Sequence, residues 1–193
     1  MLSISNAAPI DIADRILDAA AGCVVDFGVD RVTLAEIARR AGVSRPTVYR
    51  RWPDTRSILA ALLTARITGA WRDVPPRGHG REALVARIVA VADRLRRDSP
   101  VMSVLRTAPD VAMVYITQRL GTSQRVLIDA VADELRAGQR DGSVRPGDPR
   151  QLAAMVLLIT QSTIQSGPIV EPILDEQALA AELTHSLNGY LSR

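Results

Sequence analysis

Four side chains able to contact DNA occur within one short stretch of the sequence: Arg45, Thr47, Arg50 and Arg51. We expect them at exposed positions of a helix whose remaining apolar residue, Val48, faces back toward a preceding helix. An arginine guanidinium can donate two hydrogen bonds to the O6 and N7 atoms of guanine, and a hydroxyl can reach a phosphate or a base edge. The pattern predicts a recognition helix that lies in the major groove of double-stranded DNA.

The helix that would support it begins at Thr33, because Thr33 is a favourable N-cap and Glu36 follows at capping-box spacing. The apolar residues of this helix recur at helical spacing, and they are Leu34, Ile37, Ala38 and Ala41. Gly42 is the residue type expected where a helix ends in a left-handed turn. Ser44 then caps a second helix, and Pro46 fits its first turn. Together these signals predict a helix-turn-helix.

We assign the DNA-contacting residues from this motif. They are Thr33, Ser44, Arg45, Pro46, Thr47, Tyr49, Arg50 and Arg56. Our hypothesis is that Arg45 and Arg50 read bases while Tyr49 and Arg56 hold phosphates. The charge distribution supports a DNA-binding surface, because residues 31–56 contain seven arginines and two acids while the rest of the chain has 17 arginines and 19 acids.

The segment from Asp14 to Leu62 resembles the DNA-binding domain of the TetR family of bacterial transcriptional regulators. The matching residues are Arg15 to Ala20, Gly28, Thr33, Ile37, Ala38, Ala41 to Ser44, Val48, Tyr49, Trp52, Pro53, Arg56, Ile58 and Leu59. Trp52 and Arg51 depart from the usual Phe and from the common His or Tyr. The resemblance implies an all-α fold with an N-terminal three-helix helix-turn-helix domain and a C-terminal helical ligand-binding and dimerisation domain.

The second half of the 193-residue chain is predicted to be helical throughout, and no segment shows convincing strand alternation. We expect a DNA-binding domain over residues 1–56, a connecting helix over 54–72 that could carry a signal between domains, and a second domain over 73–193. The first helix runs from about Ile10 to Phe27, with Ile12, Ile16, Ala19, Ala20, Cys23 and Phe27 on one face. Gly121 marks either a kink or a break in a helical stretch, and the segment 166–168 is expected to end a helix that starts near Leu152.

The last two helices carry more apolar surface than a small domain needs, and the resemblance implies that they form a homodimer interface. The alternative is that their leucines only close the monomer core. The resemblance also implies a small-molecule effector, and the absence of lysine and the scarcity of histidine favour a hydrophobic, weakly charged one. Candidate pocket residues are Trp71, Met102, Met113, Tyr115, Gln118, Met155 and Gln161. For any one of them taken alone, ordinary core is the favoured interpretation.

The leading hypothesis is a dimeric, ligand-responsive repressor that binds a palindromic operator and has no cofactor or metal. An enzyme is disfavoured because neither His79 nor His185 lies in a nucleophile or metal motif. With 3% aromatic residues, a single-strand or RNA binder lacks a stacking platform. Non-specific nucleic-acid binding, a protein-binding adaptor and an activator remain alternatives. Cys23, as the single cysteine, is expected to be a buried thiol, and without a signal-peptide or membrane-span pattern we expect a soluble, cytoplasmic protein.

Overall fold

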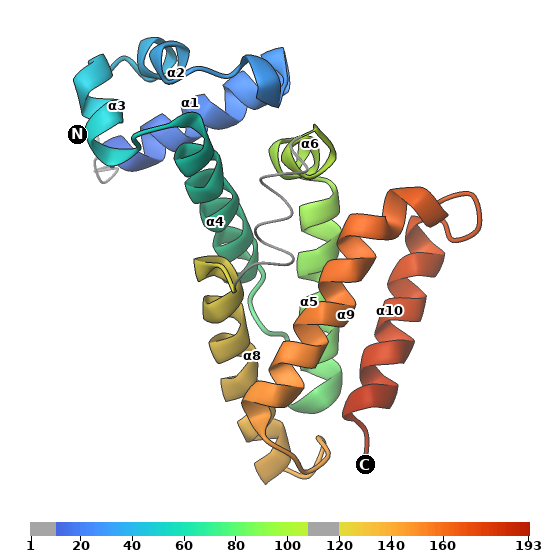
Figure 1. Cartoon of the computed structure of the whole chain (residues 1–193). Helices are drawn as coiled ribbons and strands as arrows, with labels where there is room; N and C mark the ends of the chain where they lie inside the picture. Colours follow the sequence, from blue (N-terminus) through green and yellow to red (C-terminus); the bar gives the residue numbers. More distant parts are fainter. Residues whose placement is uncertain (1–10, 108–119) are drawn as a thin grey trace, which may run out of the picture. The chain divides into compact units, whose positions relative to one another are not determined.

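The computed structural model describes residues 11–107 and 120–193, and every regular element in these two ranges is helical. The elements are α1 (Ile12–Phe27), the short 3-10 helix η1 (Val29–Arg31), α2 (Leu34–Ala41), α3 (Arg45–Arg51), α4 (Thr55–Asp73), α5 (Gly80–Arg96), α6 (Ser99–Thr107), α8 (Thr122–Arg140), α9 (Pro149–Val170) and α10 (Glu176–Leu191) (Figure 1). The all-α prediction is confirmed.

The chain forms two compact units that divide between Leu62 and Leu63, inside α4. The connecting helix predicted over residues 54–72 is therefore one continuous helix whose two halves belong to different units. Ile58 and Leu62 are buried in the first half, and Leu63 and Ala70 are buried in the second. Neither half of α4 can shift without disturbing the core that it helps to form.

The core of the first unit is made by one apolar face from each of its helices. Ile16 of α1, Ile37 of α2, Val48 of α3 and Ile58 of α4 are completely buried. The predicted face of α1 is wrong at both ends, where Ile12 and Phe27 are 43% and 38% exposed. The reason is length, since the eight residues of α2 cannot cover both ends of the 16-residue α1.

The start of α2 is capped as predicted, but the capping box is only half formed. Thr33 Oγ1 accepts a hydrogen bond of 3.2 Å from the amide of Glu36. Both carboxylate oxygens of Glu36 accept instead from the guanidinium of Arg39, at 2.8 and 2.6 Å. The Arg39 hydrogen bond lowers the pKa of Glu36, so its carboxylate stays charged next to the positive N-terminal end of α2.

The turn between α2 and α3 depends on Gly42, which has φ 64° and ψ 37° and lies in the left-handed region. The Val43 amide donates to the carbonyl of Ala38 at 3.0 Å, which completes a Schellman-type end of α2. From α1, Arg15 Nη2 donates to the Ala41 carbonyl at 2.7 Å. Ser44 then caps α3 through the Thr47 amide. The predicted turn chemistry is confirmed.

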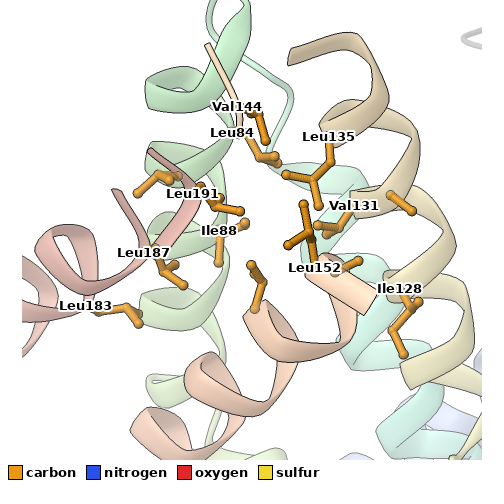
Figure 2. Close-up of a cluster of buried hydrophobic side chains, with 14 of the residues drawn as sticks. Leu84, Ile88, Ile128, Val131, Leu135, Val144, Leu152, Leu183, Leu187 and Leu191 are labelled. Carbon is orange, nitrogen blue, oxygen red and sulfur yellow. The ribbon is translucent and has the colours of Figure 1, made fainter. Parts of the chain in front are cut away.

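The core of the second unit lies among α5, α8, α9 and α10. Figure 2 shows side chains from these helices pointing toward one another, and they include Leu84, Ile88, Val131, Leu135, Leu152 and Leu187. The predicted leucine stripe of α10 is buried along its whole length, and it comprises Leu179, Leu183, Leu187 and Leu191. These leucines therefore close the core of their own unit, which is the alternative that we raised for them.

At two positions where the sequence predicts an interrupted helix, the structure decides whether the helix is interrupted. Gly121 lies immediately before α8 as its N-cap residue, so α8 starts there and Gly121 is a break. The predicted end of α9 at residues 166–168 is wrong, because the helix runs on to Val170 through Pro168. Gly167 is buried, and a Cβ at this position would lie 3.1 Å from Cδ2 of Leu179. Gly167 thus permits close packing against α10, and α9 continues through Pro168 although proline cannot donate a backbone hydrogen bond.

By length and composition alone, α9 could span a membrane, because its most apolar 18-residue window has a mean hydropathy of 1.3. The core helix of a soluble protein can meet the same criterion. Leu152, Ala153 and Val156 of α9 are buried in the core of the second unit. Contacts of α9 with α5, α8 and α10 mark it as the central helix of this unit.

Replacing Gly42 by alanine should lower the free energy of unfolding by about 1–2 kcal/mol, because a Cβ is disfavoured at positive φ. The matched control is Gly69→Ala in α4, where an added Cβ would meet only Arg72 Nη2 at 3.8 Å. That change should stabilise the helix by about 0.5–1 kcal/mol. Urea unfolding followed by circular dichroism measures both variants. Equal effects of the two substitutions would contradict the role given to the turn.

Candidate DNA-binding surface and ligand cavity

The predicted recognition helix α3 is held by one buried residue and exposes most of its other side chains. Val48 is completely buried, whereas Arg45, Pro46 and Arg50 are exposed and Tyr49 is 50% exposed. Thr47 is half-buried because its Oγ1 lies 2.7 Å from Ser44 Oγ. The side chains of Ser44 and Thr47 therefore stabilise the N-terminal end of α3. The remaining predicted contact residues, Thr33 and Arg56, are exposed next to α2 and α4.

Some arginines of this unit bind to neighbouring groups of the protein, whereas others form no ion pair with the described residues. Arg39 pairs with Glu36, and Arg40 pairs with Asp26 at 2.6 Å. The side chain of Arg31 donates to the Phe27 carbonyl at 3.0 Å. Among the described residues, no ion pair is recorded for Arg45, Arg50 or Arg51. The positive charge available to a polyanion is therefore concentrated on α3 more strongly than the sequence count indicates.

Cys23 lies behind this surface and is completely buried in α1. Burial raises the pKa of its thiol, and a hydrogen bond from Arg40 opposes this effect only in part. The thiol thus stays protonated at neutral pH and packs as a small apolar side chain. Its structural role agrees with the buried thiol expected from the sequence.

The second unit contains an apolar cavity of about 120 Å³. It is lined by the second half of α4 together with α5, α6, α8 and α9. Ile67, Val91, Leu105, Leu127 and Leu157 represent the apolar wall from these five helices. The polar lining residues are Ser123, Gln124, Thr160, Gln161 and Gln165. Within the described part of the chain, no charged side chain lines this cavity.

The structure separates the predicted pocket residues into three groups. Trp71 and Gln161 line the cavity. Met102 is buried in α6 but is not among the lining residues, and Met155 is 42% exposed on α9. Met113, Tyr115 and Gln118 lie outside the described residues. Sequence reasoning missed Ser123 and Gln124, because nothing in their local pattern shows that the start of α8 meets the far half of α9.

Within the second unit, the side chain of Arg87 on α5 contacts both the end of α4 and a residue of α8. Its guanidinium carbon lies 3.8 Å from the ring centroid of Trp71, which also lines the cavity. Its side chain donates to the carbonyls of Trp71 and Val74 at 2.9 and 2.7 Å, and it forms an ion pair with Glu134 of α8. A change in the position of Trp71 would therefore also disturb Arg87 and the end of α4.

A capped helix, a left-handed glycine turn and a short helix that exposes arginines define a helix-turn-helix DNA-binding protein. The family model for bacterial regulatory proteins of the tetR family matches residues 16–62. The chain is 67% identical over 191 residues to an HTH-type transcriptional regulator of Mycobacterium tuberculosis, covering 99% of this chain and 100% of that protein. A regulator of Mycobacterium bovis has the same identity and coverage. The chain belongs to the TetR family of transcriptional regulators.

Solved structures share the fold at low sequence identity. The TetR family repressor AlkX from Dietzia superposes with a TM-score of 0.69 and 22% identity, covering 95% of this chain and 97% of that chain. The transcriptional regulator FadR from Bacillus subtilis, solved in complex with stearoyl-CoA, gives a TM-score of 0.65 and 20% identity, covering 92% and 98%.

Replacing Arg87 by alanine should lower the free energy of unfolding by about 2–4 kcal/mol, because Glu134 and two carbonyls lose a largely buried partner. Glu134→Gln is the control, since it keeps an acceptor for the guanidinium and should cost much less. Urea unfolding followed by tryptophan fluorescence measures both. A loss of less than about 0.5 kcal/mol for Arg87→Ala would show that α4 is held by other contacts.

Proposed function

We propose that this regulator is a cytoplasmic, dimeric repressor that binds a palindromic operator and is released by an apolar effector bound in the cavity. The observation that carries the proposal is the exposed face of α3, where Arg45 and Arg50 have no recorded ion pair and the helix is fixed by Val48. We assign no catalytic role, cofactor or metal to the chain. Its curated relatives are likewise described as transcriptional regulators.

On DNA, α3 enters the major groove with its first turn toward the base edges. Arg45 and Arg50 read bases, and Tyr49 and Arg56 bind phosphates. Thr33 and Arg56 lie at the starts of α2 and α4, where helix amide groups attract phosphate oxygens. Because one recognition helix reads only a short half-site, a two-fold dimer on a palindrome supplies the length that specific binding needs.

An exposed stripe on α9 supports a homodimer through the last two helices. It follows a helical repeat of three and four residues and comprises Gln151, Met155, Leu158, Ser162, Ser166 and Ile169. Leu158 is 60% and Ile169 is 79% exposed, although the same helix is apolar enough to be a core helix. On α10, Ala181 and Gly189 are exposed small residues that permit close helix approach. Polar residues within the α9 stripe favour a partner helix over lipid.

The cavity supports the effector role, because its wall is apolar and includes part of α4. An occupant would contact Ile67 and Trp71 on α4, and the same helix continues to Ile58 in the first unit. Ligand binding can weaken DNA binding only to the extent that it favours a different state of this helix. Trp71 and its partner Arg87 are the residues through which we expect that difference to act.

Selection of bound duplexes from a random pool tests the DNA-binding proposal. We expect enrichment of an inverted repeat, because the dimer presents two identical recognition helices. Arg45→Ala should weaken the free energy of operator binding by about 1–3 kcal/mol and relax the base preference at one position of each half-site. Arg56→Ala should weaken binding to all duplexes alike and reduce the slope of log binding constant against log salt concentration by about one. Arg39→Ala is the control, since Arg39 already pairs with Glu36.

Two results would contradict this assignment. Salt-dependent binding without enrichment of any sequence would mean that the basic face acts non-specifically and that no operator exists. Equal losses on every duplex for Arg45→Ala and Arg56→Ala would refute the division into base-reading and phosphate-binding residues. Activation rather than repression of a reporter under the selected sequence would overturn the repressor part alone.

Leu158→Glu should convert the dimer to monomer at micromolar concentration, because it places a charge in the proposed apolar interface. The matched control is Val126→Glu on α8, where the wild-type side chain is 46% exposed outside the proposed interface. Light scattering after size exclusion measures the mass, and operator binding should fall only for the α9 variant. A monomeric wild type, or a Leu158→Glu dimer of unchanged affinity, would refute this interface.

A further inference from the structure

We propose that the cavity recognises an uncharged, mostly apolar molecule of about single-ring size through one hydrogen bond to a carbonyl-type oxygen, with Ser123 as the residue that selects for that oxygen. This inference rests on the proposed effector role of the cavity and deepens it, because it states the chemistry of the ligand and the residue that reads it.

Ser123 carries the argument, because its side chain is completely buried and lines the cavity. Across the described residues, its Oγ is the single buried side-chain oxygen or nitrogen without a hydrogen-bond partner. Burying a hydroxyl without a partner is unfavourable, so such groups are rare in folded proteins. A ligand oxygen in the cavity would supply the missing bond.

The neighbouring polar side chains determine what kind of ligand atom fits. Gln124 is engaged at both ends of its amide, since Nε2 donates to Gln161 Oε1 at 2.8 Å and Oε1 accepts from the Gly121 amide at 2.8 Å. The Thr160 hydroxyl donates to the Val156 carbonyl at 2.8 Å. Gln161 Oε1 already accepts one hydrogen bond from Gln124, and the Gln161 amide nitrogen can only donate. Ser123 and Gln161 can therefore donate from a hydroxyl and an amide to one ligand acceptor.

The described part of the lining offers no partner for a charged ligand group. The described wall of the cavity contains no arginine or histidine that could neutralise a carboxylate, and no acidic side chain that could neutralise an amine. An unpaired charge transferred into such a site would lose its hydration without compensation. The acceptor is therefore a ketone, ester or amide oxygen rather than a carboxylate or phosphate.

The volume of the cavity suits a small apolar molecule. Its volume of about 120 Å³ is close to the roughly 150 Å³ of an engineered apolar cavity that binds benzene. Trp71, Leu127 and Leu157 provide apolar contacts for a ring or a short branched chain. A small apolar body with one acceptor oxygen satisfies both the wall and the Ser123 corner.

Acetophenone, α-methylstyrene and benzoate form a matched probe set, because they share one ring and differ in a carbonyl oxygen, a methylene and a carboxylate. We would titrate each probe into the full-length protein by ligand-detected NMR, using wild type, Ser123→Ala and the control Thr122→Ala. Thr122 is exposed one residue earlier in the same helical turn. The measured quantity is the dissociation constant of α-methylstyrene divided by that of acetophenone.

This ratio should fall about two- to tenfold in Ser123→Ala and stay unchanged in Thr122→Ala, which is the effect of one neutral hydrogen bond. Without ligand, Ser123→Ala should also unfold at a higher temperature than wild type, because it removes an unsatisfied buried hydroxyl. Benzoate should bind wild type more weakly than acetophenone does.

An unchanged ratio, with both neutral probes bound, would overturn the role of Ser123 while leaving the effector cavity intact. A lower unfolding temperature of Ser123→Ala would also overturn it, because the hydroxyl would then stabilise the fold itself. Benzoate binding as tightly as acetophenone would refute the uncharged ligand. Binding of none of the three probes to wild type would refute the inference and the effector role of the cavity together, whereas operator selection would still test the DNA-binding role.

Discussion

The contact between Arg87 and the end of α4 is the interaction on which the coupling that we propose between the cavity and α4 depends. The Arg87 guanidinium stacks on Trp71, binds two carbonyls at the end of α4 and pairs with Glu134 of α8. Trp71 also lines the cavity, so one side chain belongs both to the proposed ligand site and to this anchor. Allosteric coupling energies are typically about 1–3 kcal/mol, which is the range that a rearranged hydrogen-bond cluster can supply.

The arginines of the first unit fall into two groups, those bonded to the protein itself and those of α3. Arg15 and Arg40 hold α1 and α2 in place through a carbonyl and a carboxylate, and Arg39 remains with Glu36 on α2. Their charged groups bind to α1 and α2, the helices that support α3. The arginines of α3 extend from a helix whose position is fixed by Val48, so a phosphate or base meets them without first breaking an ion pair of the protein. Preorganisation of this kind reduces the entropic cost of binding.

The sequence was informative where a few adjacent residues determine the structure. Thr33, Gly42 and Ser44 act through their own backbone neighbours, so their roles could be predicted without knowing the rest of the fold. The cavity could not be predicted in this way, because Gln124 and Gln161 meet only after α8 and α9 pack. The methionines show the same limit, since Met102 is buried and Met155 is exposed although both occupy apolar helical stretches. The end of α9 was predicted wrongly from Pro168, because the packing of Gly167 on Leu179 of another helix cannot be recognised from neighbouring residues.

The buried hydroxyl of Ser123 bears on the purpose of the cavity. A buried hydroxyl without a hydrogen-bond partner has a desolvation cost of about 1–3 kcal/mol. An alanine at position 123 would remove this cost without altering the helix, so stability of the fold alone does not explain the serine. The cost would fall if an apolar molecule with one acceptor oxygen bound in the cavity, as we propose. Under that proposal, binding shifts α4 only to the extent that the molecule favours one state of this helix over another.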